Sequence, residues 1–312
     1  MSLIGKPKAC NTKNANTGQA TCDTKIQKLT MLLLARDGFA IPASETTSFE
    51  DVLAYLQTAT LAADPKKRIY PIKTIQGYTE NTEAADTIKS GFGDPIGRNE
   101  KPHSYEVDLN YLGIGHHKRL RRFNEDETLR AYWVDTTFIG GQKNSAGDFV
   151  PFEVFFNLRQ VTVGNGADAI TKSVVDLSFK RPTALTDDME QIVFDEEIDL
   201  KNELYGCLDV TLSSPASMVV KANISISNVD LYDSYSTQLA TPSAWICTNA
   251  LTGQIVTPTS VTVSATNKGW TFAGLTGLVD VKLVDPTALA AINVGSTTSG
   301  GYETEGGVRL GE

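Results

Sequence analysis

Histidine, cysteine and long apolar runs are scarce in this 312-residue chain, and each scarcity disfavours a class of protein. Three histidines and four widely spaced cysteines suit neither a zinc ribbon nor a disulfide framework, so buried thiols are expected. The longest purely apolar stretches, such as 31–35, are too short to cross a bilayer, and residues 1–10 lack the apolar core of a secretory signal. We therefore expect a soluble, unsecreted chain with no membrane partner.

Catalytic motifs are also missing from the sequence. It contains no G-x-S-x-G elbow, no phosphate-binding Walker loop and no H-E-x-x-H pair, and Gly113-Ile114-Gly115 lacks the third glycine of a dinucleotide loop. The adjacent His116 and His117 would point about 100° apart on a helix, which disfavours a shared metal ion. We predict no catalytic residue, no metal, no cofactor and no enzymatic activity.

The composition changes near Tyr205, where a charged body gives way to about ninety residues rich in Ser, Thr and Val. The length suits two domains, and the patterns are typical of a mainly β chain. We predict a β-sandwich or barrel body with one or two helices, followed by an immunoglobulin-like β-sandwich. The predicted parts are an extended arm at 1–24, a body at 25–204, a sandwich at 205–296 and a flexible tail at 297–312.

One helix carries its own start signal. Ser48 precedes Asp51 by three residues, as in a capping box, and apolar residues follow at helical spacing, which predicts a helix over 49–62. Strands are predicted where β-branched and aromatic residues concentrate, with a turn over 140–147 and a long polar loop over 77–101. A loop of that length is uncommon in a compact domain unless it binds something or inserts into a partner.

Two oppositely charged segments are the strongest candidates for a binding surface. A basic run covers 116–122, and a carboxylate-rich run covers 187–199. A nucleic-acid patch, a cation site or an acid/base pair remain alternatives, but the net charge of −9 and the spacing favour a contact between copies of the chain. The predicted interface residues are His116, Lys118, Arg119, Arg121, Arg122, Asp187, Asp188, Glu196 and Glu197.

The order of these parts resembles the tail tube (major tail) proteins of tailed bacteriophages, or a related virion structural protein. The resemblance rests on the layout of 1–200, chiefly 75–93, 112–124 and the long strands near 129–180. It implies hexameric rings of this chain stacked into a tube within the virion, contacts with other virion proteins, and DNA passing through the channel without specific binding during genome ejection. The arm and long loop would bridge rings, and an acidic wall would let DNA slide because like charges avoid phosphate contacts.

Other functions stay open on the sequence alone. A carbohydrate- or host-surface-binding module would need exposed aromatics, for which Trp245, Trp270 and Tyr302 are the candidates. A head decoration or a tail terminator would show a similar composition. A hydrolase using carboxylates of 187–199 is the third hypothesis, and no second catalytic group supports it.

Overall fold

The computed structural model describes residues 2–5, 28–89, 95–109, 113–161, 172–194, 198–304 and 306–311. They form two compact units, and each is described by itself. The first comprises Met1–Leu56 and Pro65–Glu203, and the second comprises Gln57–Asp64 and Leu204–Glu312. Strands dominate both units, so the predicted mainly β fold class is confirmed.

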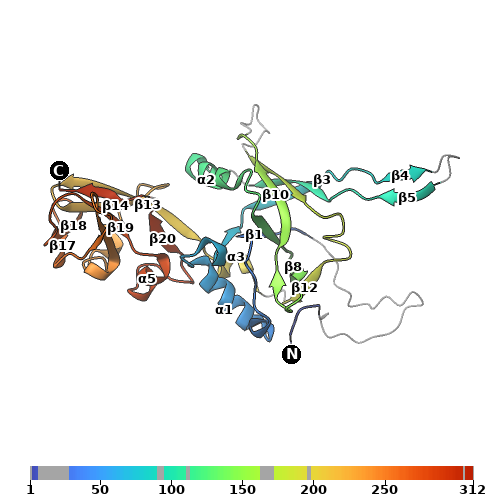
Figure 1. Ribbon diagram of the computed structural model, residues 1–312, viewed down its shortest axis with the longest axis horizontal. Helices are drawn as coiled ribbons and strands as arrows, with labels where there is room; N and C mark the ends of the chain where they lie inside the picture. The colour runs from blue at the N-terminus through green and yellow to red at the C-terminus, as the bar shows by residue number, and fades with distance from the viewer. Residues whose placement is uncertain are drawn as a thin grey trace. The chain divides into compact units, whose positions relative to one another are not determined.

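The first unit is built on a ten-stranded antiparallel sheet with the order β12-β8-β7-β10-β11-β6-β3 (Figure 1). The strand β1 lies along β7 and is followed by β2, and β9 pairs with β8. The strands are β1 (Met31–Arg36), β2 (Ile69–Ile72), β3 (Ile75–Glu80), β6 (Ser104–Leu109), β7 (Leu129–Val134), β8 (Phe138–Lys143), β9 (Phe149–Val150), β10 (Phe152–Leu158), β11 (Ser173–Phe179) and β12 (Glu190–Val193). The helical segments are η1 (Ala43–Thr46), α1 (Phe49–Thr60), η2 (Pro65–Lys67), α2 (Gly113–Leu120), η3 (Arg121–Phe123) and α3 (Leu200–Glu203). The last four residues of α1 belong to the second unit.

Alternation along β6, β10 and β11 determines which face of this sheet is buried. Tyr105, Val154 and Leu177 point into an aromatic-rich core around Trp133. The intervening residues Ser104, Phe155 and Asp176 lie on the opposite face and are partly or fully exposed. This period of two is typical of a sheet that packs one face on the core and turns the other outward.

The helix α1 begins as its sequence predicts. The Asp51 N–H donates to Ser48 Oγ at 3.1 Å, so a capping hydrogen bond satisfies one of the free N–H groups of the first turn. Ser48 and Thr47 also donate to the Asp51 carboxylate, which lowers the pKa of Asp51. The observed helix ends at Thr60, two residues before the predicted end.

The second unit is a β-sandwich of two sheets, one of order β17-β18-β14-β13-β20 and one of order β16-β15-β19-β21. Their inner faces share one core, in which the Trp245 and Trp270 rings lie 5.5 Å apart. All pairs are antiparallel except β13 with β20. The elements are β13 (Cys207–Ala216), β14 (Val219–Ile224), α4 (Tyr232–Tyr235), η4 (Pro242–Ala244), β15 (Trp245–Asn249), β16 (Ile255–Val256), β17 (Ser260–Ser264), β18 (Gly269–Ala273), β19 (Val279–Leu283), α5 (Pro286–Ala291), β20 (Gly301–Thr304) and β21 (Val308–Leu310).

Three predictions about the irregular parts of the chain differ from the structure. The predicted loop 77–101 is largely β-structure, because β3 continues toward β4 (Asp86–Lys89), which pairs with β5 (Pro95–Asn99). The predicted flexible tail at 297–312 contains β20 and β21, which complete both sheets of the sandwich. The turn predicted over 140–147 begins later, at Asn144, because Gly140 and Gly141 belong to the buried strand β8.

The start of the chain is bound to the first unit over the few residues that the structure describes there. The Leu3 N–H donates to the Thr46 carbonyl, and the Gly5 N–H donates to Gln191 in β12 at 2.8 Å. Ile4 is buried. Residues 2–5 are therefore not the free arm that the sequence predicted, and the rest of the predicted arm, 6–24, lies outside the described residues.

Candidate assembly surfaces

The basic segment lies on α2 and η3 (Figure 1). His117, Leu120 and Phe123 recur every three residues on the inward side of this segment and are buried. The remaining residues face outward, with Arg119 partly exposed and the other four exposed: His116, Lys118, Arg121 and Arg122. The apolar anchors thus hold a turn whose cationic side chains are displayed on the surface.

His117 is fixed beneath this surface. Its Nδ1 lies 3.0 Å from Ser173 Oγ at the start of β11, and both side chains are buried. Burial lowers the pKa of His117, and the positive charge of Arg121 lowers it further. The pKa of His116 is also lowered, by desolvation and by Arg119. The positive charge of the segment at neutral pH therefore comes from its lysine and arginines.

The acidic residues Asp187 and Asp188 lie in a turn just before β12. The Thr183 carbonyl accepts hydrogen bonds from the N–H groups of both residues, each at 3.0 Å. The Thr183 hydroxyl donates to the Asp188 carboxylate at 2.6 Å, which fixes the second side chain. Glu196 and Glu197, the other two predicted acidic contacts, lie outside the described residues.

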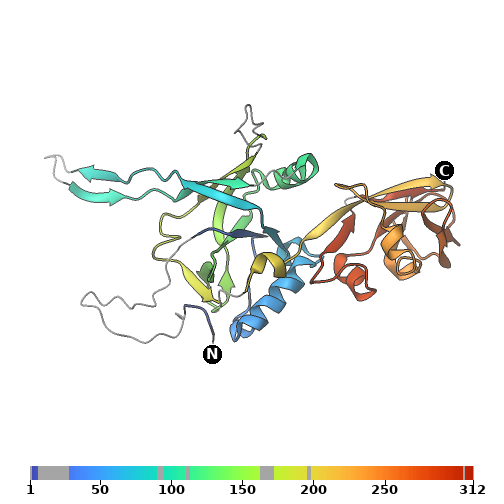
Figure 2. The same cartoon turned by 180° about the vertical axis from the view of Figure 1, so that it is seen from behind.

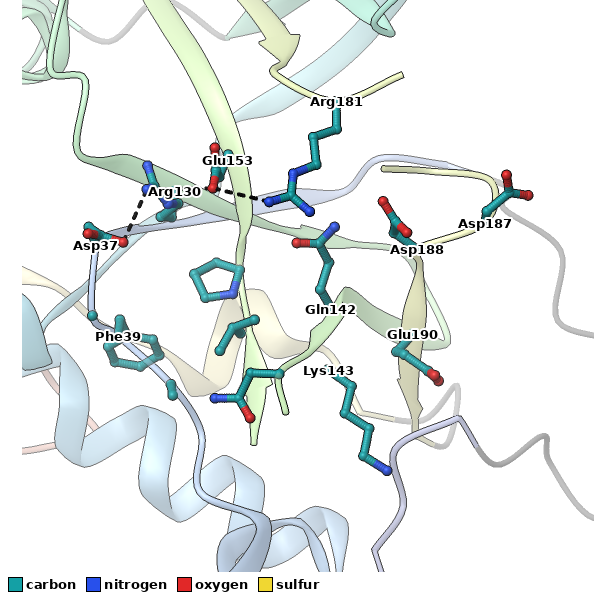
Figure 3. A pocket seen from close by; sticks show the side chains of 15 residues that line it. Asp37, Phe39, Arg130, Gln142, Lys143, Glu153, Arg181, Asp187, Asp188 and Glu190 are labelled. Carbon is teal, nitrogen blue, oxygen red and sulfur yellow. Dashed lines mark hydrogen bonds and ion pairs between the residues drawn. The ribbon is translucent and has the colours of Figure 1, made fainter. Parts of the chain in front are cut away.

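This turn forms one wall of a groove of about 610 Å³ in the first unit (Figure 3). On the other wall Arg130 lies between Asp37, at 3.1 Å, and Glu153, at 3.9 Å. Figure 3 shows Asp187, Asp188 and Glu190 gathered on the opposite side, apart from that network. Five carboxylates and three cationic side chains line the groove, so its net charge is negative.

The groove could not be identified from the sequence, because its lining comes from separate segments that only the sheet brings together. Asp37 follows β1, Lys143 ends β8, and Glu190 begins β12. The only sequence signal for the groove is the acidic run, and this run identifies one of its two walls. Among the described residues no group of His, Cys, Asp and Glu is arranged to hold a metal ion.

The two charged surfaces lie far apart within one chain. Figures 1 and 2 show α2 in the upper part of the first unit and β12 in its lower part from both viewpoints. Within the part of the chain that the structure describes, the side chains of Asp187 and Asp188 make no ion pair with the basic segment. A contact between the two surfaces would have to join two copies.

A two-stranded ribbon projects from the sheet edge at β3 and β6 (Figure 1). Its outer strands β4 and β5 pair only with each other within the described residues. Lys101 and Asp86 form an ion pair at 2.7 Å, and the side chain of Ile88 is half exposed. Isolated two-stranded ribbons are marginally stable in water, so this one is typical of an element that a neighbouring molecule covers.

The outward face of β10, β11 and β6 carries several ion pairs beside the half-exposed ring of Phe155. Arg159 bridges Asp176 and Glu106, with a distance of 3.0 Å to the latter, and Lys172 contacts Asp108 at 2.7 Å. Ser104 and Ser178 are hydrogen bonded to each other at 2.9 Å. Arg159 and Lys172 are thus already engaged by carboxylates, which weakens their attraction for a phosphate backbone.

Comparisons with known proteins give no family for this chain. No protein-family model matches it, and no curated protein shows significant similarity. Among the described residues no helix is both long and apolar enough to cross a membrane.

Proposed function

We propose that this chain is a structural virion protein that self-assembles into stacked rings, forming a phage tail tube through which the genome passes. The observation that carries the proposal is the β3–β6 ribbon, whose outer strands β4 and β5 pair only with each other among the residues that the structure describes. A partner that covers the ribbon would supply the burial that it lacks. The partner in this proposal is another copy of the chain in the adjacent ring.

Two further features support homotypic assembly. The strand β3 ends the ten-stranded sheet, so its outer edge offers backbone groups to a neighbouring sheet. The outward face of β10, β11 and β6 suits a channel wall, because its Arg159 and Lys172 are neutralised by carboxylates. DNA moving along such a wall would meet few unpaired cations.

The proposal is tested by removing the ribbon while keeping the sheet. Asn81 donates to the Ser104 carbonyl at 2.8 Å, so residues 82–103 can be replaced by the two-residue turn Asn-Gly without changing the register of β3 and β6. Negative-stain electron microscopy and sedimentation would compare this variant with the full-length chain. We expect rings or tubes from the full-length protein, and a folded variant that forms no tubes.

Two results would contradict the proposal. A full-length protein that stays monomeric at every concentration would exclude self-assembly of the chain alone. Tubes of normal length from the ribbonless variant would show that the ribbon does not join rings. Far-ultraviolet circular dichroism and denaturant unfolding of the variant would verify that its fold is intact.

The structure offers little for the carbohydrate-binding alternative. Trp245 and Trp270 are buried in the sandwich core, where their ring N–H groups donate to the carbonyls of Leu239 and Ser236. Tyr302 is partly buried and contacts Tyr235 edge to face. We therefore propose no glycan site on these residues.

A further inference from the structure

The sandwich contains a long stretch without ionisable charge. No Asp, Glu, Lys, Arg or His occurs between Ser234 and Asn267, although 21% of the whole chain is Asp, Glu, Lys or Arg. This stretch supplies β16 and β17, which are the end strands of the two sheets and are joined by residues 257–259. One side of the sandwich is therefore an uncharged pair of strand edges.

Apolar side chains of this uncharged stretch are unusually exposed. The exposed fraction is 84% for Leu251 and 76% for Ile255, the two largest among the exposed large hydrophobics of the described residues. Val263 in β17 is 44% exposed. Soluble proteins commonly guard edge strands with lysine, proline or a bulge, and β17 (Ser260–Ser264) contains neither lysine nor proline. Such an edge is typical of a strand that pairs with another chain.

The hydrogen bonds of β18 show which groups of β17 face outward. The Phe272 N–H donates to Met218 at 2.8 Å, so Phe272 turns its backbone groups toward β14. Its neighbour Thr271 therefore faces β17, where it lies opposite Thr262. Because consecutive residues of a strand turn their N–H and C=O groups to opposite sides, Thr262 faces β18. Val261 and Val263 then present their backbone groups at the open edge.

The sequence of β17 reads the same in both directions: Ser260-Val261-Thr262-Val263-Ser264. If two copies pair antiparallel with Thr262 on a two-fold axis, Val261 of each copy lies opposite Val263 of the other. Those are the two residues whose backbone groups are free at the edge, so the pairing forms a complete hydrogen-bonded ladder. It also covers the exposed face of Val263.

We propose that the β17 edge is a homotypic contact, in which the sandwiches of two copies join their sheets through antiparallel pairing of β17 with β17. The chain carries a net charge of −9, so two copies repel each other, and this uncharged side lets them approach with the least repulsion. The contact is isologous and closes at two copies, because each sandwich has one β17 edge. The proposal is independent of the tail-tube assignment, because it rests on observations in the second unit, whereas those that support the tail tube lie in the first.

Disulfide trapping in the full-length chain tests this register. Cys207 and Cys247 are buried, and burial raises the pKa of Cys247 to about 11, so replacing Cys10 and Cys22 by Ser gives a background with slowly reacting thiols. In that background, Thr262→Cys places two thiols across the axis, where Cα atoms of a non-hydrogen-bonded pair are about 4.5 Å apart. Mild oxidation should give a covalent dimer on a non-reducing gel.

Ser260→Cys is the matched control, because it lies on the same strand and the same side as Thr262. Antiparallel pairing separates the two copies of residue 260 by about 14 Å, too far for a disulfide. This variant should stay monomeric on the gel when oxidised alone. Mixed with Ser264→Cys, it should give a dimer that contains one copy of each variant.

Adding a charge at the axis gives a second readout. Thr262→Lys on both copies should slow cross-linking between residues 260 and 264 by about twofold to fivefold, because like charges then lie directly opposite. Thr237→Lys adds the same charge to an exposed turn in the uncharged stretch and should leave the rate unchanged. If Ser260→Cys cross-links when oxidised alone, the two β17 strands pair in parallel. If Thr262→Cys does not cross-link, the β17 edge is a contact for another protein and not for a second copy of this chain. Either result would overturn the proposal.

Discussion

The imidazole Nδ1 of His117 lies 3.0 Å from the hydroxyl oxygen of Ser173, and this buried pair attaches the basic helix α2 to β11. Burial and Arg121 lower the pKa of His117 in the folded chain below its ordinary value of 6.5. As pH falls through about 6.5 the unfolded chain takes up a proton here, whereas the folded chain resists it. Protonation therefore favours unfolding.

We expect the free energy of unfolding of the first unit to fall as pH is lowered from 7.5 to 5.5, in denaturant titrations at each pH. His117→Asn keeps a hydrogen-bonding group near Ser173 but cannot take up a proton, so its stability should depend less on pH. His116 still titrates in this variant and leaves part of the slope. Equal slopes in the two proteins would mean that His117 does not contribute.

The cap of α1 gives a direct stability prediction. Ser48→Ala removes the acceptor of the Asp51 N–H and a donor to the Asp51 carboxylate, and should lower the free energy of unfolding by about 1 kcal/mol. Ser44→Ala, in the exposed part of η1, should change it by less than about 0.5 kcal/mol. Chemical denaturation would measure both variants, and equal effects would exclude a capping role for Ser48.

Gly141 in β8 should not tolerate a side chain. A Cβ atom at this position would lie 2.8 Å from the Phe149 ring and 2.9 Å from the Tyr132 ring, and those two rings stack on each other. We expect Gly141→Ala to lower the free energy of unfolding by about 1–3 kcal/mol. Gly77→Ala in β3 is the control, because nothing lies within 4 Å of its added Cβ. A neutral Gly141→Ala would show that these rings, and the Val150 carbonyl oxygen that would also lie 2.8 Å from the added Cβ, can move apart.

If the basic segment of one copy contacts the acidic wall of the groove in another, exchanging the charges of the two surfaces should rescue assembly. Lys118→Glu with Arg121→Glu should weaken assembly, and so should Asp187→Lys with Asp188→Lys. The two pairs of changes together should restore assembly in part, since opposite charges again face each other. Sedimentation at low and high salt would measure the effect, which should fade as salt screens the charges.

The control for that experiment changes the net charge equally at other exposed sites, with Lys67→Glu and Lys282→Glu. Loss of assembly in the control as well would indicate a general effect of net charge. If the combined variant shows no rescue, the two surfaces do not contact each other, even if each surface alone contributes to assembly.

The sequence predicts the elements whose signals are local. Ser48 and Asp51 mark the start of α1 because a cap needs only residues three apart. The sequence did not predict the ribbon, because the residues of β4 and β5 show no alternation of apolar and polar types. Gly141 was read as a turn, yet it is glycine because Tyr132 and Phe149 occupy the space of a side chain. Such packing depends on residues far apart in sequence.

The candidate surfaces follow the same rule. The sequence shows the charges of the basic and acidic runs directly. It does not show that the His117 side chain points inward, because that orientation depends on Ser173 in a distant strand. The groove required β1, β8 and β12 to lie side by side, and a pattern within any one of them gives no sign of it. The sequence did not predict the strands within 297–312, because β20 is recognisable only from its pairing with β13.

The second unit is discontinuous along the chain, and this limits how it can be inherited or transplanted. The Leu61 carbonyl accepts a hydrogen bond from Thr287 at 3.0 Å, and the Cys207 thiol lies 3.5 Å from the Thr60 carbonyl. A gene segment that starts at Tyr205 would encode a sandwich without this covering stretch, leaving Cys207 and Gly301 open to solvent. Fusion to another protein, by recombination or by engineering, would therefore have to carry Gln57–Asp64 along with it.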